Sequence, residues 1–133
     1  SGTANQGYDG GDSNGNNAGG GGGAGAAGSN SPPSSRPVPG GAGLSSSITG
    51  SAVTRGAGGN GSANPAATKT DGTGDGGDGS DSVATSDGAD GIVILRMADA
   101  DYSGTTTGSP TVATGVGGSD TVISFTASGS YTV

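Results

Sequence analysis

GIVILRM, residues Gly91 to Met97, is an apolar run in a chain that otherwise consists mainly of glycine, serine, threonine, alanine and aspartate. Because the run is short and rich in β-branched residues, it predicts a strand that is buried on both faces. A second stretch, TVISFTASGSYTV at 121–133, alternates apolar and hydroxyl-bearing side chains and predicts a half-buried strand, with a hairpin or bulge at Ser128-Gly129. Together the two stretches predict a small β layer at the end of the chain.

The rest of the composition leaves little apolar surface to bury. Of 133 residues, 33 are glycine, and glycine loses more conformational freedom on folding than any other residue. An isolated two-stranded sheet is marginal in water. We therefore expect a mostly β fold with extensive glycine-rich coil and no helix. We expect the remaining strands to come from copies of the chain, or from upstream strands of a longer protein outside these residues.

The change in composition predicts two regions. Residues 1–90 form a glycine-rich, low-complexity region with a short hairpin at 44–55, and residues 91–133 form the β-strand segment. Gly19, Gly22, Gly25 and Gly28 recur at every third position. Such a spacing fits polyglycine II helices, which have three residues per turn and must bond to neighbours because they lack internal hydrogen bonds. The alternative interpretation of the same residues is a coil or linker.

Charge and residue types exclude several classes of function. The net charge is −7, and the four basic residues are scattered, so no basic patch is present to bind nucleic acid. No apolar run reaches the length of a membrane span, so we expect no membrane insertion. Cysteine and histidine are absent, which removes disulfides and thiolate or imidazole metal sites.

One stretch matches a calcium motif. Residues 76–84, GGDGSDSVA, fit the nonapeptide of calcium-binding β-rolls, and the next nine residues keep part of the register. Asp78, Asp81 and Asp90 are the candidate ligands, since carboxylate oxygens are what a hard cation prefers. About three repeats are needed for a stable roll, so a solvated acidic loop is the competing interpretation.

Catalytic chemistry finds little support. Asp99 and Asp101 would share a strand face if the first strand continued, but nothing in the sequence places a substrate against them. We therefore expect no enzyme. Tyr8 and Tyr102 are candidates for surface contact, because aromatic rings among glycines can bind sugars or anchor an interface. Tyr131 is expected to pack on Phe125 along one strand face.

The strand motifs resemble a known family. GLSSSITGSAVTRG at 43–56, a glycine-rich stretch and then DGIVILRM resemble the end of the glycine-rich modules of bacteriophage tail fibres and related virion surface proteins. Met97 stands where an aromatic residue is usual in that family. TVISFTASGSYTV is similar to the strand that often opens the next module. The resemblance implies a virion-associated, fibrous or decorating protein, and it does not imply a receptor.

These observations lead to one expectation and two alternatives. We expect a non-enzymatic virion structural protein, a segment of a phage tail or head fibre that acts outside the cell. Its partners would be copies of itself, with a trimer favoured, or other virion proteins, and host adhesion would add a surface glycan or protein. The alternatives are a secreted acidic module that folds around calcium and a disordered linker between larger domains.

Overall fold

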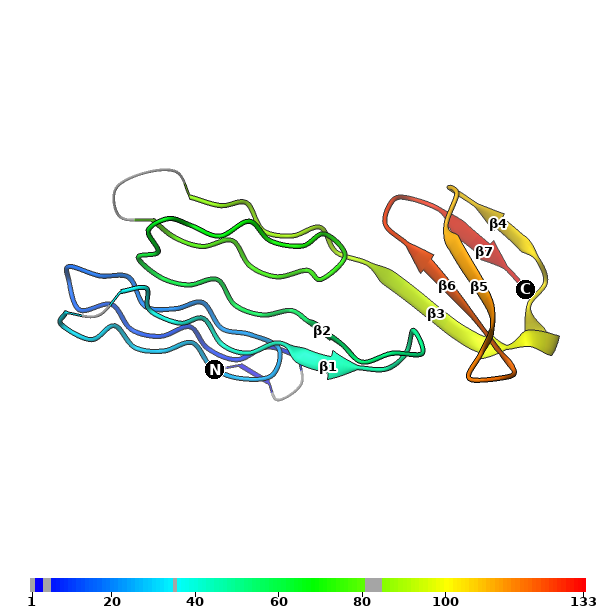
Figure 1. Cartoon of the computed structure of the whole chain (residues 1–133), viewed down its shortest axis with the longest axis horizontal. Coiled ribbons are helices and arrows are strands. Elements are labelled where there is room, and N and C mark those ends of the chain that lie inside the picture. The colour runs from blue at the N-terminus through cyan, green and yellow to red at the C-terminus, as the bar shows by residue number, and fades with distance from the viewer. Residues whose placement is uncertain (1, 4–5, 35, 81–84) are drawn as a thin grey trace. The chain divides into compact units, whose positions relative to one another are not determined.

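The computed structural model describes residues 2–3, 6–34, 36–80 and 85–133 (Figure 1). The chain forms two compact units. The first, here called the glycine unit, comprises residues 1–44 and 54–90, and the second, the β unit, comprises residues 45–53 and 91–133. A hairpin of β1 (Leu44–Ser46) and β2 (Val53–Arg55) lies at the chain boundaries between the units. The sequence predicts a division at residue 90 and a hairpin at 44–55.

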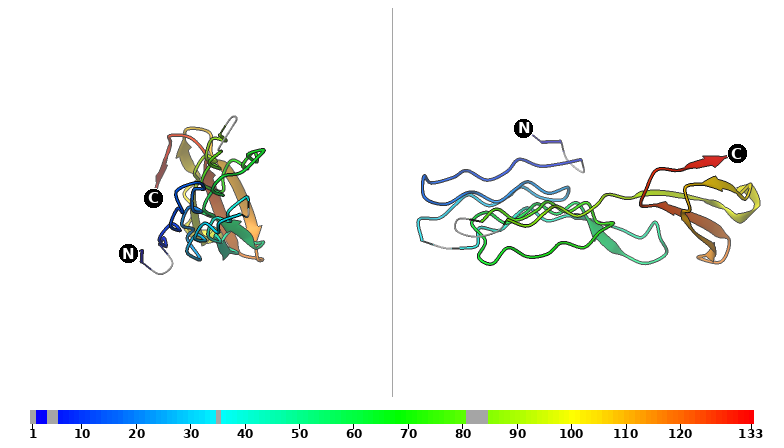
Figure 2. Two further views of the ribbon diagram at one scale, coloured as in Figure 1. Left: turned by 90° about the vertical axis from the view of Figure 1, so that its left-hand side faces the viewer. Right: turned by 90° about the horizontal axis from the view of Figure 1, so that it is seen from above.

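The glycine unit consists of extended segments that run back and forth side by side, as the views in Figures 1 and 2 agree. Its main-chain hydrogen bonds join neighbouring segments and repeat every third residue. Tyr8 and Gly11 donate to the carbonyls of Gly23 and Gly20, at 2.9 and 2.8 Å. Successive residues of one segment therefore bond to different neighbours, which is the arrangement of polyglycine II helices with three residues per turn.

The segment at 18–25 shows this arrangement most completely. Its Gly20 N–H donates to Ser29 of the following segment, whereas its Gly21 N–H donates to Gly59, far along the chain. Gly21 in turn accepts a hydrogen bond from Gly41. A chain region with almost no apolar side chains thus pairs most of its backbone groups through main-chain bonds to several neighbours at once.

Glycine is required where these segments touch. A Cβ built on Gly20 would overlap the carbonyl of Pro39, and one on Gly58 would overlap the carbonyl of Gly21. Gly19, Gly22, Gly25 and Gly28, which recur at every third position, likewise approach carbonyls of neighbouring segments. The three-residue glycine spacing thus corresponds to polyglycine II packing in the structure. Apolar burial is limited to a few side chains, with Val38 0% and Ala63 2% exposed.

The β unit holds two small antiparallel sheets. In the first, β6 (Asp120–Phe125) lies between β3 (Val93–Ala98) and β5 (Thr111–Val116). In the second, β4 (Thr105–Thr107) pairs with β7 (Ser130–Thr132). A single 3₁₀ turn, η1 (Asp99–Asp101), follows β3.

The two predicted strands do pair: Leu95 lies opposite Ile123 in the antiparallel register of β3 and β6. The prediction that all further strands come from outside these residues is wrong, because β5 of the same chain pairs with the other side of β6. The sequence does not indicate a strand at Thr111–Val116, because all but the last of its residues are exposed and no buried face marks it.

The burial expected for β3 is also wrong. β3 is an edge strand, and Val93 is 61% exposed, because a strand that pairs on one side only cannot be enclosed by a sheet this small. Burial falls instead on β6, where Thr121 and Ile123 are 0% exposed and Val122 is 4% exposed. The central strand of the sheet is thus the one that the sequence analysis expected to be half solvated.

The stretch 121–133 does not form one strand. Its first part is β6, which ends at Phe125, and its last part is β7, which belongs to the other sheet. Tyr131 and Phe125 therefore do not lie on one strand face. A Cβ on Gly129 would lie 2.8 Å from ring atoms of Phe125, and the absence of that atom lets the ring pack over the turn. Tyr131 stacks on Tyr102 instead, with ring centroids 5.9 Å apart and an interplanar angle of 21°.

The fold class is confirmed. The chain is mostly β, with small open sheets, and the described residues contain no α-helix. In the part of the chain that the structure describes, no helix is long and apolar enough to cross a bilayer.

Candidate functional site

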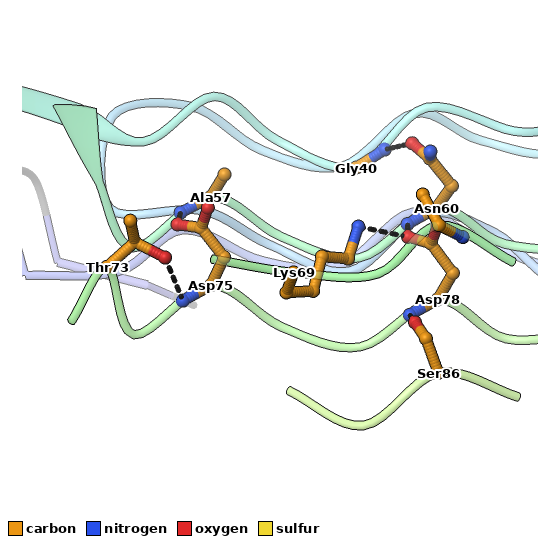
Figure 3. Close-up of polar contacts among 9 residues, drawn as sticks. Gly40, Ala57, Asn60, Lys69, Thr73, Asp75, Asp78 and Ser86 are labelled. Carbon is orange, nitrogen blue, oxygen red and sulfur yellow. Dashed lines mark hydrogen bonds and ion pairs between the residues drawn. The ribbon is translucent and has the colours of Figure 1, made fainter. Parts of the chain in front are cut away.

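Aspartate side chains brace the glycine unit at three-residue intervals (Figure 3). Oδ1 of Asp75 accepts a hydrogen bond from the Ala57 N–H at 2.8 Å, and Oδ1 of Asp78 accepts one from the Asn60 N–H at 2.7 Å. Because both donors and both acceptors are three residues apart, the carboxylates occupy equivalent positions in successive turns. Each takes the role that a neighbouring main-chain carbonyl fills elsewhere in the unit.

Asp78 is the most heavily bonded of these side chains. It is 2% exposed, and its Oδ1 lies 2.6 Å from Nζ of Lys69, whose side chain is 15% exposed. Oδ2 accepts the Ala67 N–H at 2.9 Å. A buried carboxylate with this many donors is a structural anchor, because it holds the segment at 66–70 against the segment at 73–80.

The electrostatic balance at Asp78 favours the ionised form. Burial raises the pKa of the carboxyl group, but hydrogen bonds from the Lys69 ammonium and from the Ala67 and Asn60 N–H groups, with the Lys69 charge, lower it by more. The pKa therefore lies below its ordinary value. Asp78 is an anion whose charge is neutralised inside the protein.

The candidate calcium ligands are placed differently from one another. Asp78 directs its oxygens to Lys69 and to main-chain donors, whereas Asp90 is exposed and its main-chain carbonyl accepts from Gly72 and Gly74. Asp78 bonds to Ser86 while Asp90 lies farther along that segment. Asp81 lies outside the described residues. Among the described residues, no group of three acidic side chains could hold a metal ion.

The pair of braces at Asp75 and Asp78 was not predicted, although the sequence carries a signal for it. GDGGDG places Asp75 and Asp78 three residues apart within a glycine-rich stretch. In a helix with three residues per turn, that spacing puts both carboxylates on one side, against the same neighbour. Asparagine plays a similar part elsewhere, since Oδ1 of Asn60 accepts the Gly40 N–H at 3.0 Å.

Among the described residues, three connections between segments lie at the same end of the glycine unit (Figure 1). We call them the loop end, and they comprise residues 13–17, 32–34, 36–37 and 62–66. Nδ2 of Asn14 donates to the Pro32 carbonyl at 2.8 Å, which ties the first connection to the second. The N–H of Ala18, the residue directly after the first connection, donates to Oγ of Ser62 at 3.0 Å, which holds the first connection next to the third. The loop end is thus a set of short polar connections that the hydrogen-bonded segments hold together.

The two candidate contact tyrosines lie in different units. Tyr8 is half-buried in a segment of the glycine unit, where its N–H bonds to Gly23. Tyr102 is half-buried in the β unit and stacks on Tyr131, whose hydroxyl donates to the Asp101 carbonyl at 3.0 Å. The stacked pair therefore links the chain after η1 to β7.

Asp99 and Asp101 do not form a carboxylate pair on a strand, since both belong to the 3₁₀ turn η1. Oδ1 of Asp99 accepts from the hydroxyl of Thr121 at 2.7 Å and from the Gly115 N–H at 3.3 Å. Asp99 is therefore a brace between η1 and the ends of β5 and β6.

Comparison with protein-family models, with curated proteins and with solved structures yields no significant match.

Proposed function

We propose that this chain is a non-enzymatic structural protein of a virus particle, a segment of a fibre or appendage that is presented outside the cell. The resemblance of its strand motifs to glycine-rich tail-fibre modules suggests the class. The observation that carries the proposal is the three-residue pattern of main-chain hydrogen bonds in the glycine unit. Such a lattice holds extended segments in place without a large apolar core, which suits a rigid support.

We further propose that the loop end adheres to the host surface. Binding residues are commonly found on loops that a rigid scaffold positions, and the loop end consists of polar connections held by hydrogen bonds between loops. Its exposed asparagine, serine and proline side chains offer donors, acceptors and flat apolar faces, which are the groups that a glycan or a protein surface requires. The expected assembly is a homo-oligomer, with the trimer favoured.

Immunogold labelling tests the structural part of the proposal. Antibodies raised against the purified chain are expected to label appendages of intact virus particles in cultures of the source virus, and pre-immune serum gives the background. Labelling confined to free protein in the medium would contradict a place in the particle. Light scattering tests the assembly, since a trimer has about three times the chain mass of 12.0 kDa.

Cell binding tests the adhesive part. Fluorescently labelled full chain is expected to be retained on host cells in flow cytometry. Asn16→Glu should reduce retention at least about tenfold, because it adds a charge to the loop end at a side chain that makes no described hydrogen bond. Ser45→Glu, which changes an exposed residue of β1, is the matched control and should bind as the wild type does. Equal loss in both variants, or no retention on any host tested, would limit the function to scaffolding.

A further inference from the structure

One side of the glycine unit carries a groove of about 530 Å³ whose walls are almost entirely main chain. We call it the glycine groove. It runs along three segments that come from separate parts of the sequence, at 18–24, 56–61 and 74–79. Gln6 and Gly7, near the start of the chain, line its edge. A groove this size is in the range of ligand sites in proteins, although here few side chains line it.

The walls of the groove are glycines that face solvent. Gly21, Gly22 and Gly76 are exposed, and Gly59 is buried at the floor. A Cβ on Gly21 would lie 3.3 Å from the Gly59 nitrogen, and one on Gly76 would lie 3.0 Å from it. The Gly59 amide therefore lies between the two walls, and a partner can approach the backbone here as closely as the unit's own segments approach one another.

The floor of the groove presents a donor that the fold leaves unused. On the same segment, Gly58 donates to the Gly41 carbonyl, and Ala57 and Asn60 donate to the Asp75 and Asp78 carboxylates. Among the hydrogen bonds of the described residues, the Gly59 N–H has no acceptor, although Gly59 is buried. Buried main-chain N–H groups are paired in more than about 90% of cases, so an unpaired one favours a partner that supplies an acceptor.

The wall offers further groups of the same kind. Within the described residues, Gly22 uses neither its N–H nor its carbonyl in a hydrogen bond, whereas Gly20, Gly21 and Gly23 on either side of it all do. Gly19, three residues earlier in the same segment and also in the groove lining, likewise makes no main-chain hydrogen bond within the described residues. The groove thus combines an unpaired donor at its floor with unpaired main-chain groups on one wall.

We propose that the glycine groove binds one extended polypeptide segment in the polyproline II or polyglycine II conformation, with glycine at every third residue. Only a main chain with the same three-residue repeat can offer its carbonyls at the spacing of these groups. A partner that packs as closely as the unit's own segments do must have glycine on the side that faces the groove, because at such contacts a Cβ overlaps a neighbouring carbonyl, as it would at Gly20 and Gly58. The partner is recognised by its backbone conformation, as proline-rich peptides are in other proteins.

The length of the groove sets the size of the partner. The wall segment at 18–24 has seven residues, and at about 3.1 Å per residue it extends for roughly 22 Å. A nine-residue peptide, Gly-Pro-Ser repeated three times, covers this length, and its proline residues restrict the free chain to the bound conformation and so reduce the entropy cost of binding. This inference does not depend on the proposed role in a virus particle.

The experiment measures binding of the labelled peptide to the purified full chain by fluorescence anisotropy. Saturable binding is expected for the wild type. The peptide Ala-Pro-Ser repeated three times differs only by a methyl group at each third residue and should bind at least about tenfold more weakly. In nitrogen-15 spectra, the Gly59 amide signal should shift on binding and its exchange with solvent should slow.

Two alanine variants test the place of binding. Gly21→Ala puts a Cβ at a wall of the groove, 3.3 Å from the Gly59 nitrogen, and should weaken binding at least about tenfold. Gly10→Ala is the matched control: it is exposed, its Cβ would also lie 3.3 Å from a main-chain atom, the Gly20 oxygen, and it does not line the groove. Gly79→Ala, whose Cβ meets nothing nearer than 3.9 Å, is a second groove variant for the case that Gly21→Ala loses its fold.

Several outcomes would overturn the proposal. One is the absence of saturable binding to the wild type, and another is equal binding of the glycine and alanine peptides. Equal affinity of the groove variants and Gly10→Ala would place the peptide elsewhere. If light scattering showed association of the chain that Gly21→Ala abolished and the peptide did not compete with, the groove would instead be an interface between copies.

Discussion

The Lys69 ammonium lies 2.6 Å from Oδ1 of Asp78, and the side chains are 15% and 1% exposed. This ion pair is buried in a unit that has almost no apolar core. Removing one partner of a buried pair leaves the other charge uncompensated, which costs about 3–5 kcal/mol. We therefore expect Asp78→Ala to lower the free energy of unfolding of the glycine unit by about that amount, measured by urea titration with hydrogen exchange of its amides as the probe.

The matched control for this substitution is Asp87→Ala. Asp87 is an exposed aspartate of the same unit, and its removal should change the free energy of unfolding by less than about 0.5 kcal/mol. Equal effects of the two substitutions would mean that the loss follows net charge and that the pair has no special role.

The same pair predicts how stability depends on pH. The folded pKa of Asp78 lies below its ordinary value of 3.8, so the group stabilises the fold fully at pH values above the unfolded pKa. That stabilisation is lost as the pH falls below 3.8 and through the folded pKa, because the unfolded chain then binds a proton that the folded chain excludes. The free energy of unfolding, measured from pH 6 down to pH 2, should decrease as the pH is lowered for the wild type, and should decrease less steeply for Asp78→Asn. If the free energy of unfolding depended on pH equally in the two proteins, carboxylates other than Asp78 would cause the sensitivity to acid.

Calcium should have little effect on stability at Asp78. A cation would have to displace the Lys69 ammonium and two main-chain donors from that carboxylate. We expect the midpoint of thermal unfolding to be the same in millimolar calcium and in chelator, measured by circular dichroism at constant ionic strength. A rise in the midpoint with calcium that magnesium does not reproduce would instead support the calcium-binding alternative.

The β layer could be predicted because side chains encode it. The apolar run at Gly91–Met97 and the alternation beginning at Thr121 indicate two strands, and Leu95 does pair with Ile123. The strand Thr111–Val116 could not be found in this way, because side chains exposed on both faces leave no alternation to read. The burial of β6 and the exposure of Val93 depend on which strand is central, and that order is a property of the whole sheet.

The glycine unit shows the opposite limit. A glycine at every third position indicates the helix type, but a main-chain hydrogen bond does not depend on which side chains flank it, so many pairings of such segments satisfy the same sequence. The pairing of Gly21 with Gly59 could not be derived for this reason. Asp75 and Asp78 carry the missing information, because their side chains fix the register against Ala57 and Asn60.

The core of the β unit gives a fourth prediction. Ile123 is 0% exposed at the centre of β6, so Ile123→Ala should lower the free energy of unfolding by about 2–5 kcal/mol through lost burial and the cavity that remains. Val93→Ala on the edge strand, where the side chain is 61% exposed, should cost less than about 1 kcal/mol. Thermal unfolding followed by near-ultraviolet absorbance of the tyrosines measures both. Similar losses would mean that β3 is covered by another chain in solution.

Close main-chain contact in the glycine unit gives the last prediction. A Cβ on Gly20 would overlap the carbonyl of Pro39, and neither group can turn aside because both belong to the backbone of bonded segments. Gly20→Ala should therefore lower the free energy of unfolding by about 3 kcal/mol or more. Elsewhere, replacing glycine by alanine ordinarily stabilises a fold, because alanine reduces the conformational entropy of the unfolded chain. Hydrogen exchange should show loss of protection at Tyr8 and Gly11, which donate to Gly23 and Gly20 of this segment, and at Gly21, which follows Gly20 and donates to Gly59. Gly91→Ala, which meets nothing within 4 Å, controls for the change of residue type and should be neutral. If both substitutions were tolerated alike, the segments would have room between them, and the lattice of main-chain bonds would not be what holds this unit together.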